Sequence, residues 1–441
     1  METVWLAVVG ILFQLFDYWQ GRGLRKAGLL VVIGALCWAL YRWTGTKRIA
    51  MRRPPAVTWI LLAAALLLLG NSIVRGVGSF AWSRRQGDVL HDQGQIAHRT
   101  LRLLGQGVNP YGSHTMLDPL AFADQVDALA RRPECGSVDP DAATRAFAEY
   151  WDGHVDAGRM LTLPPVVADS PTCHGLHVKF QSLGYHYGPV LLAAYLPLVA
   201  LFGPAGIYAV HLLALLIWIA VLGVWLKQTL VSVAWVPALS AMIVFLLAPT
   251  HINDIFLQLA ASDLIPTILA SVGLLCWLQG RDVAAAVLVA LSVGSKLFPG
   301  VLFAPLLLRN RKAVVVCVVV TVALYLPFAV WEPAGLIHNL LYPFTIRDTT
   351  SPLAAISPAA GTLLRIGAVG SIGAWIWRLA IQRWPGRESL LFLVSLHLAA
   401  LVLGGMSHNN YLIWAMAAIA VFWIWMVDRS GEPAAEGATR V

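Results

Sequence analysis

Residues 57–92 read VTWILLAAALLLLGNSIVRGVGSFAWSRRQGDVLHD, an apolar run followed by a polar turn. The run from 57 to 79 is long enough to cross the roughly 30 Å hydrocarbon core of a bilayer. About ten residues beyond its end, Asp88, His91 and Asp92 open a polar region that continues to residue 186. Carboxylates at this point of the chain would lie at the membrane surface, next to lipid and open to water. The stretch therefore predicts a membrane protein with titratable groups at its water-facing surface.

The overall composition is that of a membrane protein. The 441 residues are 58% hydrophobic and only 12% charged, with a mean hydropathy of +0.70. Globular domains contain about twice this share of charged residues, so we predict a polytopic membrane protein. Further apolar runs of span length or nearly so are 205–226, 233–249, 262–279, 313–331, 358–379, 389–404 and 411–427. We expect an all-α bundle of about 11–13 transmembrane helices with a large extracytoplasmic first loop.

The basic residues predict the orientation. The formal net charge is +8, and the basic residues cluster in short links, namely Lys47, Arg48, Arg52 and Arg53; Arg309, Arg311 and Lys312; and Arg378, Arg383 and Arg387. The positive-inside rule makes these links cytoplasmic and residues 80–186 extracytoplasmic. That loop holds more than half of the acidic residues and of the histidines. We expect a multi-pass protein of a bacterial inner membrane with its chemistry outside, and no nucleic-acid partner.

Three parts of the chain follow from this pattern. Residues 1–56 hold two extra hydrophobic segments and a basic cytoplasmic link, 57–427 form the transmembrane module, and 428–441 are a polar cytoplasmic tail. The first apolar segment carries Asp17 and lacks a cleavage pattern, so no cleavable signal peptide is expected. Of the five cysteines, only Cys135 and Cys173 lie outside apolar spans. In an oxidising compartment we expect them to form a disulfide.

Several shorter elements are expected as well. The outer loop favours helices at 91–105, 118–131 and 140–152. Parity of the membrane crossings makes 189–202 a partial, re-entrant helix, which is tolerated when it is buried in protein. The short segments 283–294 and 297–308 predict a shallow hairpin with Lys296 at its tip. His211 and His397 lie within apolar spans and are expected to hydrogen-bond a neighbouring helix.

The polar breaks between spans carry the candidate chemistry, and we expect them to converge on one cavity. Asp88 and Asp92 offer a general base for a hydroxyl group, or are acids favoured by the start of a helix. We expect Asp88, which is nearer the predicted membrane surface, to be the general base and Asp92 to position the acceptor or to substitute for Asp88. Asp92 is nearer the Asn-Pro-Tyr element, so the two assignments are close. Lys296 offers a cation for a lipid phosphate, or is an interfacial lysine that extends its ammonium to water.

The remaining candidates are polar and aromatic. His186 and Arg347 are candidate phosphate ligands alongside Lys296. Candidate substrate-binding residues are His91, Asn109, Tyr111, Tyr185, Tyr187, Asn253, Asp254, His408, Asn409 and Asn410. The sequence contains no P-loop and no dinucleotide fingerprint, so a cytosolic nucleotide-sugar donor is unsupported and no cofactor is expected. No Cys or His cluster has the spacing of a zinc site.

Four motifs in order carry a resemblance to a known family. An acidic residue follows an early span, Gly107 to Tyr111 reads Gly-x-Asn-Pro-Tyr, Tyr185 or Tyr187 with Pro189 leads into the next apolar segment, and Lys296 to Pro299 reads Lys-x-x-Pro. Over about 57–425 the chain resembles the GT-C superfamily of integral-membrane glycosyltransferases, closest to polyprenyl-phosphate-mannose-dependent mannosyltransferases. It departs from them in the two hydrophobic segments before the aspartate and in Tyr-His-Tyr-Gly-Pro where Tyr-Pro-Pro is usual.

The resemblance implies a function. A sugar (mannose or another hexose or pentose) would move from a polyprenyl-phosphate donor to an extracytoplasmic lipid, glycan or protein acceptor of the cell envelope, with inversion and an aspartate as base. The resemblance also implies that no metal is needed. The alternatives are a transporter or flippase of a lipid-linked sugar, a glycan ligase using a lipid diphosphate, and a non-catalytic assembly protein. An inverted repeat, frequent in transporters, is not seen in the hydrophobic pattern.

Overall fold

The computed structural model describes residues 55–87, 89, 92–111, 185–229, 235–248, 252–345 and 412–429. Within these ranges the chain forms helices joined by short connections and contains no strand, which confirms the all-α prediction. The predicted spans 358–379 and 389–404, the predicted loop helices 118–131 and 140–152, and the N-terminal segments lie outside the described residues.

The first two described helices are α3 (Pro55–Gln86) and α4 (Asp92–Gly105), so the predicted helix at 91–105 is confirmed. The others are α8 (Pro189–Phe202), α9 (Ala205–Thr229), α10 (Trp235–Leu247), the π-helix η5 (Ile252–Gln258), α11 (Leu264–Leu278), α12 (Asp282–Ser295), α13 (Leu297–Phe303), the 3-10 helix η6 (Ala304–Arg309), α14 (Arg311–Trp331), α15 (Pro333–Thr345) and α18 (Leu412–Arg429).

Among the described residues, three helices are long and apolar enough to cross a membrane. They are Thr58–Gln86 of α3, α9 and α14. A fourth span results if α10 and η5, which are bent by 72°, are counted together. These helices support a membrane protein, whereas the total of about 11–13 spans stays a prediction because several predicted spans fall outside the described part.

Helix α3 is longer than the predicted span 57–79. Phe80 packs edge-on against Phe202 of α8, with 5.5 Å between ring centroids, and the Arg84 guanidinium lies 6.0 Å from the same ring. These contacts extend the helix past the apolar run, and Gly87 ends it with a φ of +71° that favours glycine. Asp88 thus follows the helix after one residue, not after about ten.

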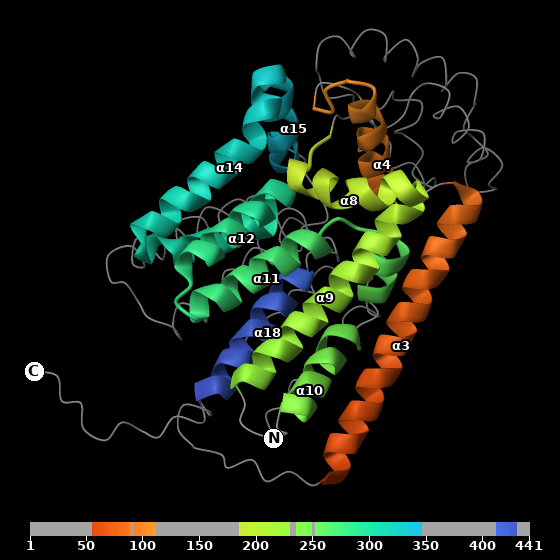
Figure 1. The fold of residues 1–441 in the computed structure, drawn as a ribbon, viewed down its shortest axis with the longest axis vertical. Coiled ribbons are helices and arrows are strands. Elements are labelled where there is room, and N and C mark those ends of the chain that lie inside the picture. Colours follow the sequence, from red (N-terminus) through yellow and green to blue (C-terminus); the bar gives the residue numbers. More distant parts are fainter. Residues whose placement is uncertain are drawn as a thin grey trace, which may run out of the picture.

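The helices form a bundle with a crossing helix at one end (Figure 1). Helices α9, α11, α12 and α14 run in similar directions, with α3 along one side and α14 along the other, and α8 lies across the end that also carries α4. With 14 residues α8 is about 21 Å long, too short to cross the bilayer. Its short length agrees with the predicted partial helix, while its depth in the membrane stays a prediction.

Two groups of buried residues hold the bundle together. The larger one joins α3, α9, α10, α11 and α18 and includes the fully buried Trp218, Phe245 and Phe256. The smaller one lies where α4 and α8 meet and is rich in tyrosine. The larger core is almost entirely apolar. The smaller core contains buried tyrosine hydroxyl groups, which need hydrogen-bond partners, so polar interactions are expected at that end of the bundle.

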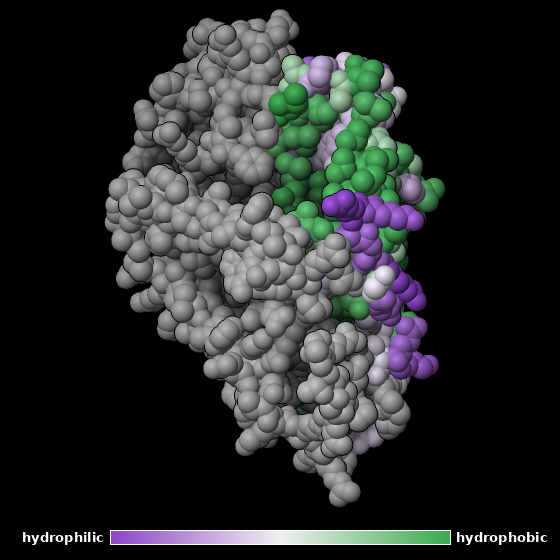
Figure 2. All heavy atoms as spheres, turned by 90° about the vertical axis from the view of Figure 1, so that its left-hand side faces the viewer, coloured by the Kyte–Doolittle hydropathy of each residue, from purple (hydrophilic) through white to green (hydrophobic). Residues whose placement is uncertain are grey.

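The outer surface of α14 is apolar along most of its length. Val315, Val319 and Val322 are 54–60% exposed. Figure 2 shows the hydrophobic area on this side of the molecule, bordered by a hydrophilic area; the exposed Arg311 and Lys312 lie at the start of α14. An exposed valine face with a basic end is typical of a lipid-facing span.

Candidate functional site

Lys296 lies between two consecutive helices and is held in the interior. It has an extended backbone (φ −158°, ψ 137°) between the end of α12 and the start of α13, as the predicted hairpin requires. Its Nζ lies 2.8 Å from an Asp263 carboxylate oxygen, and the side chain is only 14% exposed. The ammonium also lies 5.2 Å from the centroid of the Tyr187 ring, within the range of a cation–π contact. Lys296 is therefore a paired, largely buried cation and differs from an interfacial lysine that places its ammonium in bulk water.

Asp263 is the most important site residue that sequence analysis missed. Its side chain is completely buried. It occupies the N-cap position of α11, where an aspartate usually accepts a hydrogen bond from the first turn, yet it makes no such bond. Its carboxylate is paired with Lys296 instead. The available signal was a lone acid at the start of the apolar run 262–279, because ionisable groups within membrane segments are costly and usually have a function.

The start of α4 is fixed to the segment just before Asp263. The Gln93 carbonyl oxygen Oε1 accepts hydrogen bonds from the backbone N–H of Ser262 (2.7 Å) and from its hydroxyl (2.8 Å), across 169 residues of sequence. Gly94 fits here because a Cβ would overlap the Val89 side chain and approach that of Ala260. The first turn of α4, which begins with Asp92, thus adjoins the segment that carries the buried ion pair. Asp88, His91 and the side chain of Asp92 lie outside the described residues.

Ala260, in the same segment, has an unusual backbone. Its φ of 56° lies in the left-handed region, which a residue with a Cβ rarely adopts. Such a conformation costs about 1 kcal/mol or more and persists only where the surroundings enforce it. Here Ala260 is completely buried and packs against α4 at Gly94, and this packing enforces the conformation. The connection between η5 and α11 is therefore a fixed turn that holds Ser262 and Asp263 in place.

Two loops, residues 108–111 and residues 185–188, meet beside Lys296 and are joined by hydrogen bonds of their tyrosines. The Tyr185 N–H donates to the Pro110 carbonyl (3.0 Å), and the Tyr111 hydroxyl donates to the Tyr187 carbonyl (2.8 Å). The Tyr185 hydroxyl donates to the Gly188 carbonyl (3.1 Å). Burial raises the pKa of the Tyr111 and Tyr185 phenols well above the usual value. Both hydroxyls therefore stay protonated and bind the two loops together.

The Gly-x-Asn-Pro-Tyr element is folded on itself and anchored to α15. The Asn109 side-chain oxygen accepts a hydrogen bond from the Tyr111 N–H at 3.0 Å. The Asn339 amide of α15 donates to the Tyr111 and Gly335 carbonyls. Asn339 was not singled out from the sequence. These bonds make Asn109 and Tyr111 part of the site's framework in this structure, and a direct contact of either with a substrate stays a prediction.

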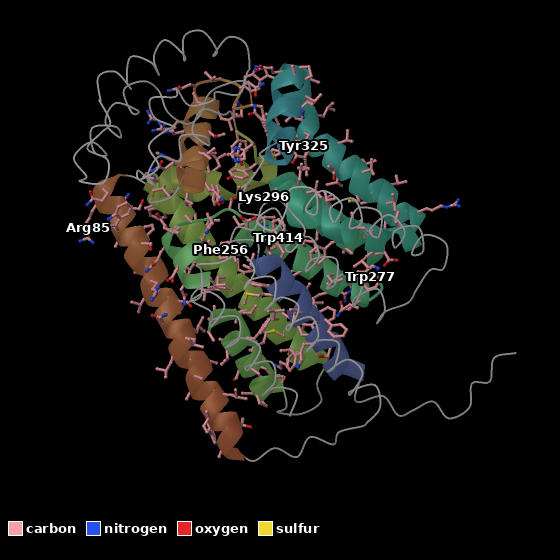
Figure 3. All side chains as sticks on the ribbon, turned by 180° about the vertical axis from the view of Figure 1, so that it is seen from behind. Arg85, Phe256, Trp277, Lys296, Tyr325 and Trp414 are labelled. Atoms are coloured by element: carbon pink, nitrogen blue, oxygen red, sulfur yellow. The ribbon has the colours of Figure 1, made fainter. Side chains whose placement is uncertain are left out.

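Gly188 allows the loop of residues 185–188 to pack against the end of α12. Its N–H donates to the Ser295 carbonyl at 2.8 Å. A Cβ at this position would overlap the Gly294 carbonyl and lie 2.7 Å from the Tyr325 hydroxyl, which itself donates to the Val293 carbonyl. Figure 3 shows Lys296 in the interior, between α4 and α8 on one side and Tyr325 of α14 on the other. The absence of a side chain at Gly188 is what allows Tyr187 to reach Lys296.

Gly188→Ala is expected to push this loop off α12 and to destabilise the protein by about 1–3 kcal/mol, as overpacking typically does. Thermal unfolding of the purified protein in detergent measures the change. Gly78→Ala is the matched control, because a Cβ there meets no atom within 4 Å. Equal unfolding temperatures for Gly188→Ala and the wild type would contradict the close approach.

The other predicted site residues are distributed less simply. Asp254 forms an ion pair with Arg75 of α3, so the structure brings it to α3 and not to Lys296. Asn253 beside it is 3% exposed. The partly exposed His186 ring lies 4.2 Å, centroid to centroid, from Tyr187. The predicted residues Arg347, His408, Asn409, Asn410, Cys135 and Cys173 lie outside the described part of the chain.

His211 of α9 hydrogen-bonds neighbouring helices, as predicted. Its Nδ1 lies 2.8 Å from the Phe256 carbonyl, which can only accept, so Nδ1 carries the proton. Its Nε2 then accepts from the Tyr195 hydroxyl at 2.7 Å. One neutral imidazole thereby joins α8, α9 and η5.

His211→Leu is expected to lower the free energy of unfolding by about 1–3 kcal/mol, because the buried Tyr195 hydroxyl loses its acceptor. The Phe256 carbonyl also loses the imidazole N–H that donates to it. Adding Tyr195→Phe should recover part of the loss, since it removes the unpaired hydroxyl. Chemical or thermal unfolding of both variants in detergent tests this, and no recovery in the double variant would argue against the Tyr195 bond.

The site's chemistry follows from these contacts. The described residues bring together three features at one end of the bundle. They are the start of α4, which carries Asp92, the buried ion pair of Asp263 and Lys296, and the tyrosine-containing loop of residues 185–188. Three or more His, Cys, Asp or Glu side chains able to hold a metal do not come together within the described ranges. A cavity of about 10 Å³ near Trp277 lies at the other end of α11 and is far too small for a substrate.

Comparisons with known proteins add no identification: no protein-family model, curated protein or solved structure matches the chain.

Proposed function

We propose that this protein is an integral-membrane glycosyltransferase of the GT-C type that uses a polyprenyl-phosphate sugar as donor. The observation that carries the proposal is the linkage of the Asp92-bearing turn to Lys296. Gln93 bonds Ser262, the adjacent Asp263 pairs with Lys296, and Lys296 contacts the ring of Tyr187. A turn that carries an acid and is bonded to the segment next to a buried cation suits the transfer of a sugar from a lipid phosphate.

In the proposed reaction, Asp92 or Asp88 accepts the proton of an acceptor hydroxyl. That oxygen forms a bond to the anomeric carbon from the side opposite the phosphate. The bond between the anomeric carbon and the phosphate oxygen breaks, and its electron pair leaves with polyprenyl phosphate, so the configuration inverts. Lys296, assisted by His186 and Arg347, stabilises the charge on the leaving phosphate.

A lipid-linked sugar transporter is the second candidate, and one observation favours it. A buried acid–lysine pair next to interrupted helices is also a feature of ion-coupled carriers. The extracytoplasmic acids at the start of α4 would then have no chemical role. The enzyme explains both features and is the better-supported candidate.

Sugar transfer can be measured directly. Purified protein is incubated with polyprenyl phosphates carrying labelled mannose or other labelled hexoses or pentoses, with membrane lipids as acceptors. Release of polyprenyl phosphate together with a labelled, inverted glycoside is expected. Labelled lipid crossing a liposome bilayer without bond cleavage would instead support the transporter. Lipids that accumulate in a deletion strain, identified by mass spectrometry, would reveal the natural sugar and acceptor.

A further inference from the structure

The positive charge of Lys296 is already compensated before any ligand binds. Its ammonium lies 2.8 Å from Asp263, whose side chain has no exposure to solvent. The Tyr187 ring contacts the ammonium as well. An anionic ligand must therefore compete with a fixed carboxylate for this lysine.

The reaction of the proposed function changes the charge of its lipid ligand. The donor is a phosphodiester with one negative charge. The product, polyprenyl phosphate, is a phosphomonoester with a second pKa near 6 and hence about −1.5 to −2 charges at neutral pH. Because Coulomb attraction grows with charge, an isolated lysine would bind the product more tightly than the donor. Slow product release would then limit turnover.

We infer that Asp263 competes with the product phosphate for Lys296. Re-formation of the ion pair between Asp263 and Lys296 thereby promotes product release. This inference rests on the proposed function. Asp263 repels a dianion more strongly than a monoanion and is held in position, since Thr267 bonds its carbonyl (2.6 Å) and Gln93 bonds the preceding Ser262. Asp263 is thus a positioning residue that acts on the lipid phosphate through Lys296.

The test compares the affinities of two lipids in the full-length protein in detergent. One is polyprenyl phosphate and the other is its methyl phosphodiester, which mimics the charge of the donor. In the wild type, the monoester is expected to bind no more tightly than the diester. Asp263→Asn is expected to raise monoester affinity by about tenfold or more and diester affinity by less. In steady-state assays kcat and donor KM should both fall, and inhibition by added polyprenyl phosphate should strengthen.

Two further variants locate the effect. Asp282→Asn is the matched control: Asp282 lies at the opposite end of α12, where it accepts a hydrogen bond from Asn310 at 2.8 Å. It should leave the monoester-to-diester ratio at the wild-type value. The double variant Asp263→Asn with Lys296→Gln should bind the monoester more weakly than the wild type, since the attracting charge is gone.

The outcomes separate clearly. The inference is overturned if the wild type binds the monoester at least tenfold more tightly than the diester, a measurement that needs no variant. It is also overturned if folded Asp263→Asn keeps the wild-type ratio. If the wild type releases labelled sugar while Asp263→Asn leaves the ratio unchanged, only this inference fails. If no sugar is transferred, the proposed function fails whatever the binding ratios are.

Discussion

Asp92→Asn is expected to slow sugar transfer by about 10²–10⁴-fold while the protein still binds its lipid donor, the usual effect of removing a general base. The reason is positional. Asp92 begins α4, and Gln93 next to it is hydrogen-bonded to Ser262, directly before the partner of Lys296. An asparagine keeps the size of the side chain but cannot accept the acceptor's proton. Initial rates with labelled donor, together with donor-binding measurements, test this.

Asp88→Asn is the companion variant, because the sequence favoured Asp88 as the base and the hydrogen bond between Gln93 and Ser262 now favours Asp92. We expect it to reduce the rate less than Asp92→Asn. Near-wild-type turnover in Asp92→Asn with an inactive Asp88→Asn would transfer the role of base to Asp88. Full activity in both variants would exclude the mechanism proposed above. For the base variant, the pH–rate profile should also lose its acidic limb.

Lys296→Met is expected to destabilise the protein by about 3–5 kcal/mol, because it leaves the carboxylate of Asp263 buried without its cation. That carboxylate is 0% exposed, whereas the Lys296 side chain is 14% exposed. Asp263→Asn should therefore cost less than Lys296→Met. In Asp263→Asn, the Lys296 ammonium keeps its contact with the Tyr187 ring and some access to water. An asparagine is also a favourable N-cap for α11.

The double variant Lys296→Met with Asp263→Asn decides whether the ion pair causes this loss. It should recover most of the stability lost in Lys296→Met, since no unpaired charge stays buried. Thermal unfolding in detergent of the wild type, both single variants and the double variant completes the cycle. Additive losses would mean that the two side chains do not depend on each other.

The pattern of apolar runs correctly predicted most described helices, with ends a few residues off. The hairpin at Lys296 and the hydrogen-bonding role of His211 were predicted as well. The length of α3 was underestimated, because its last turns are held by Phe202 of α8, a contact that hydropathy does not encode. Asp263 was missed for a similar reason: within a span it resembled an ordinary boundary residue, and only its pairing with Lys296 reveals its place in the site.

The sequence by itself determined the helical class, the apolar character and the positions of the polar breaks, because these depend on composition and on spacing along one chain. It also nominated Asp92, Lys296 and Tyr187 individually. Only the tertiary structure decided which of these groups meet. Gln93 and Ser262 are 169 residues apart, and no local pattern predicts that they hydrogen-bond. Burial then forces each charge to find a partner, since an unpaired ion is too costly in the interior, and so Asp263 came to be paired with Lys296.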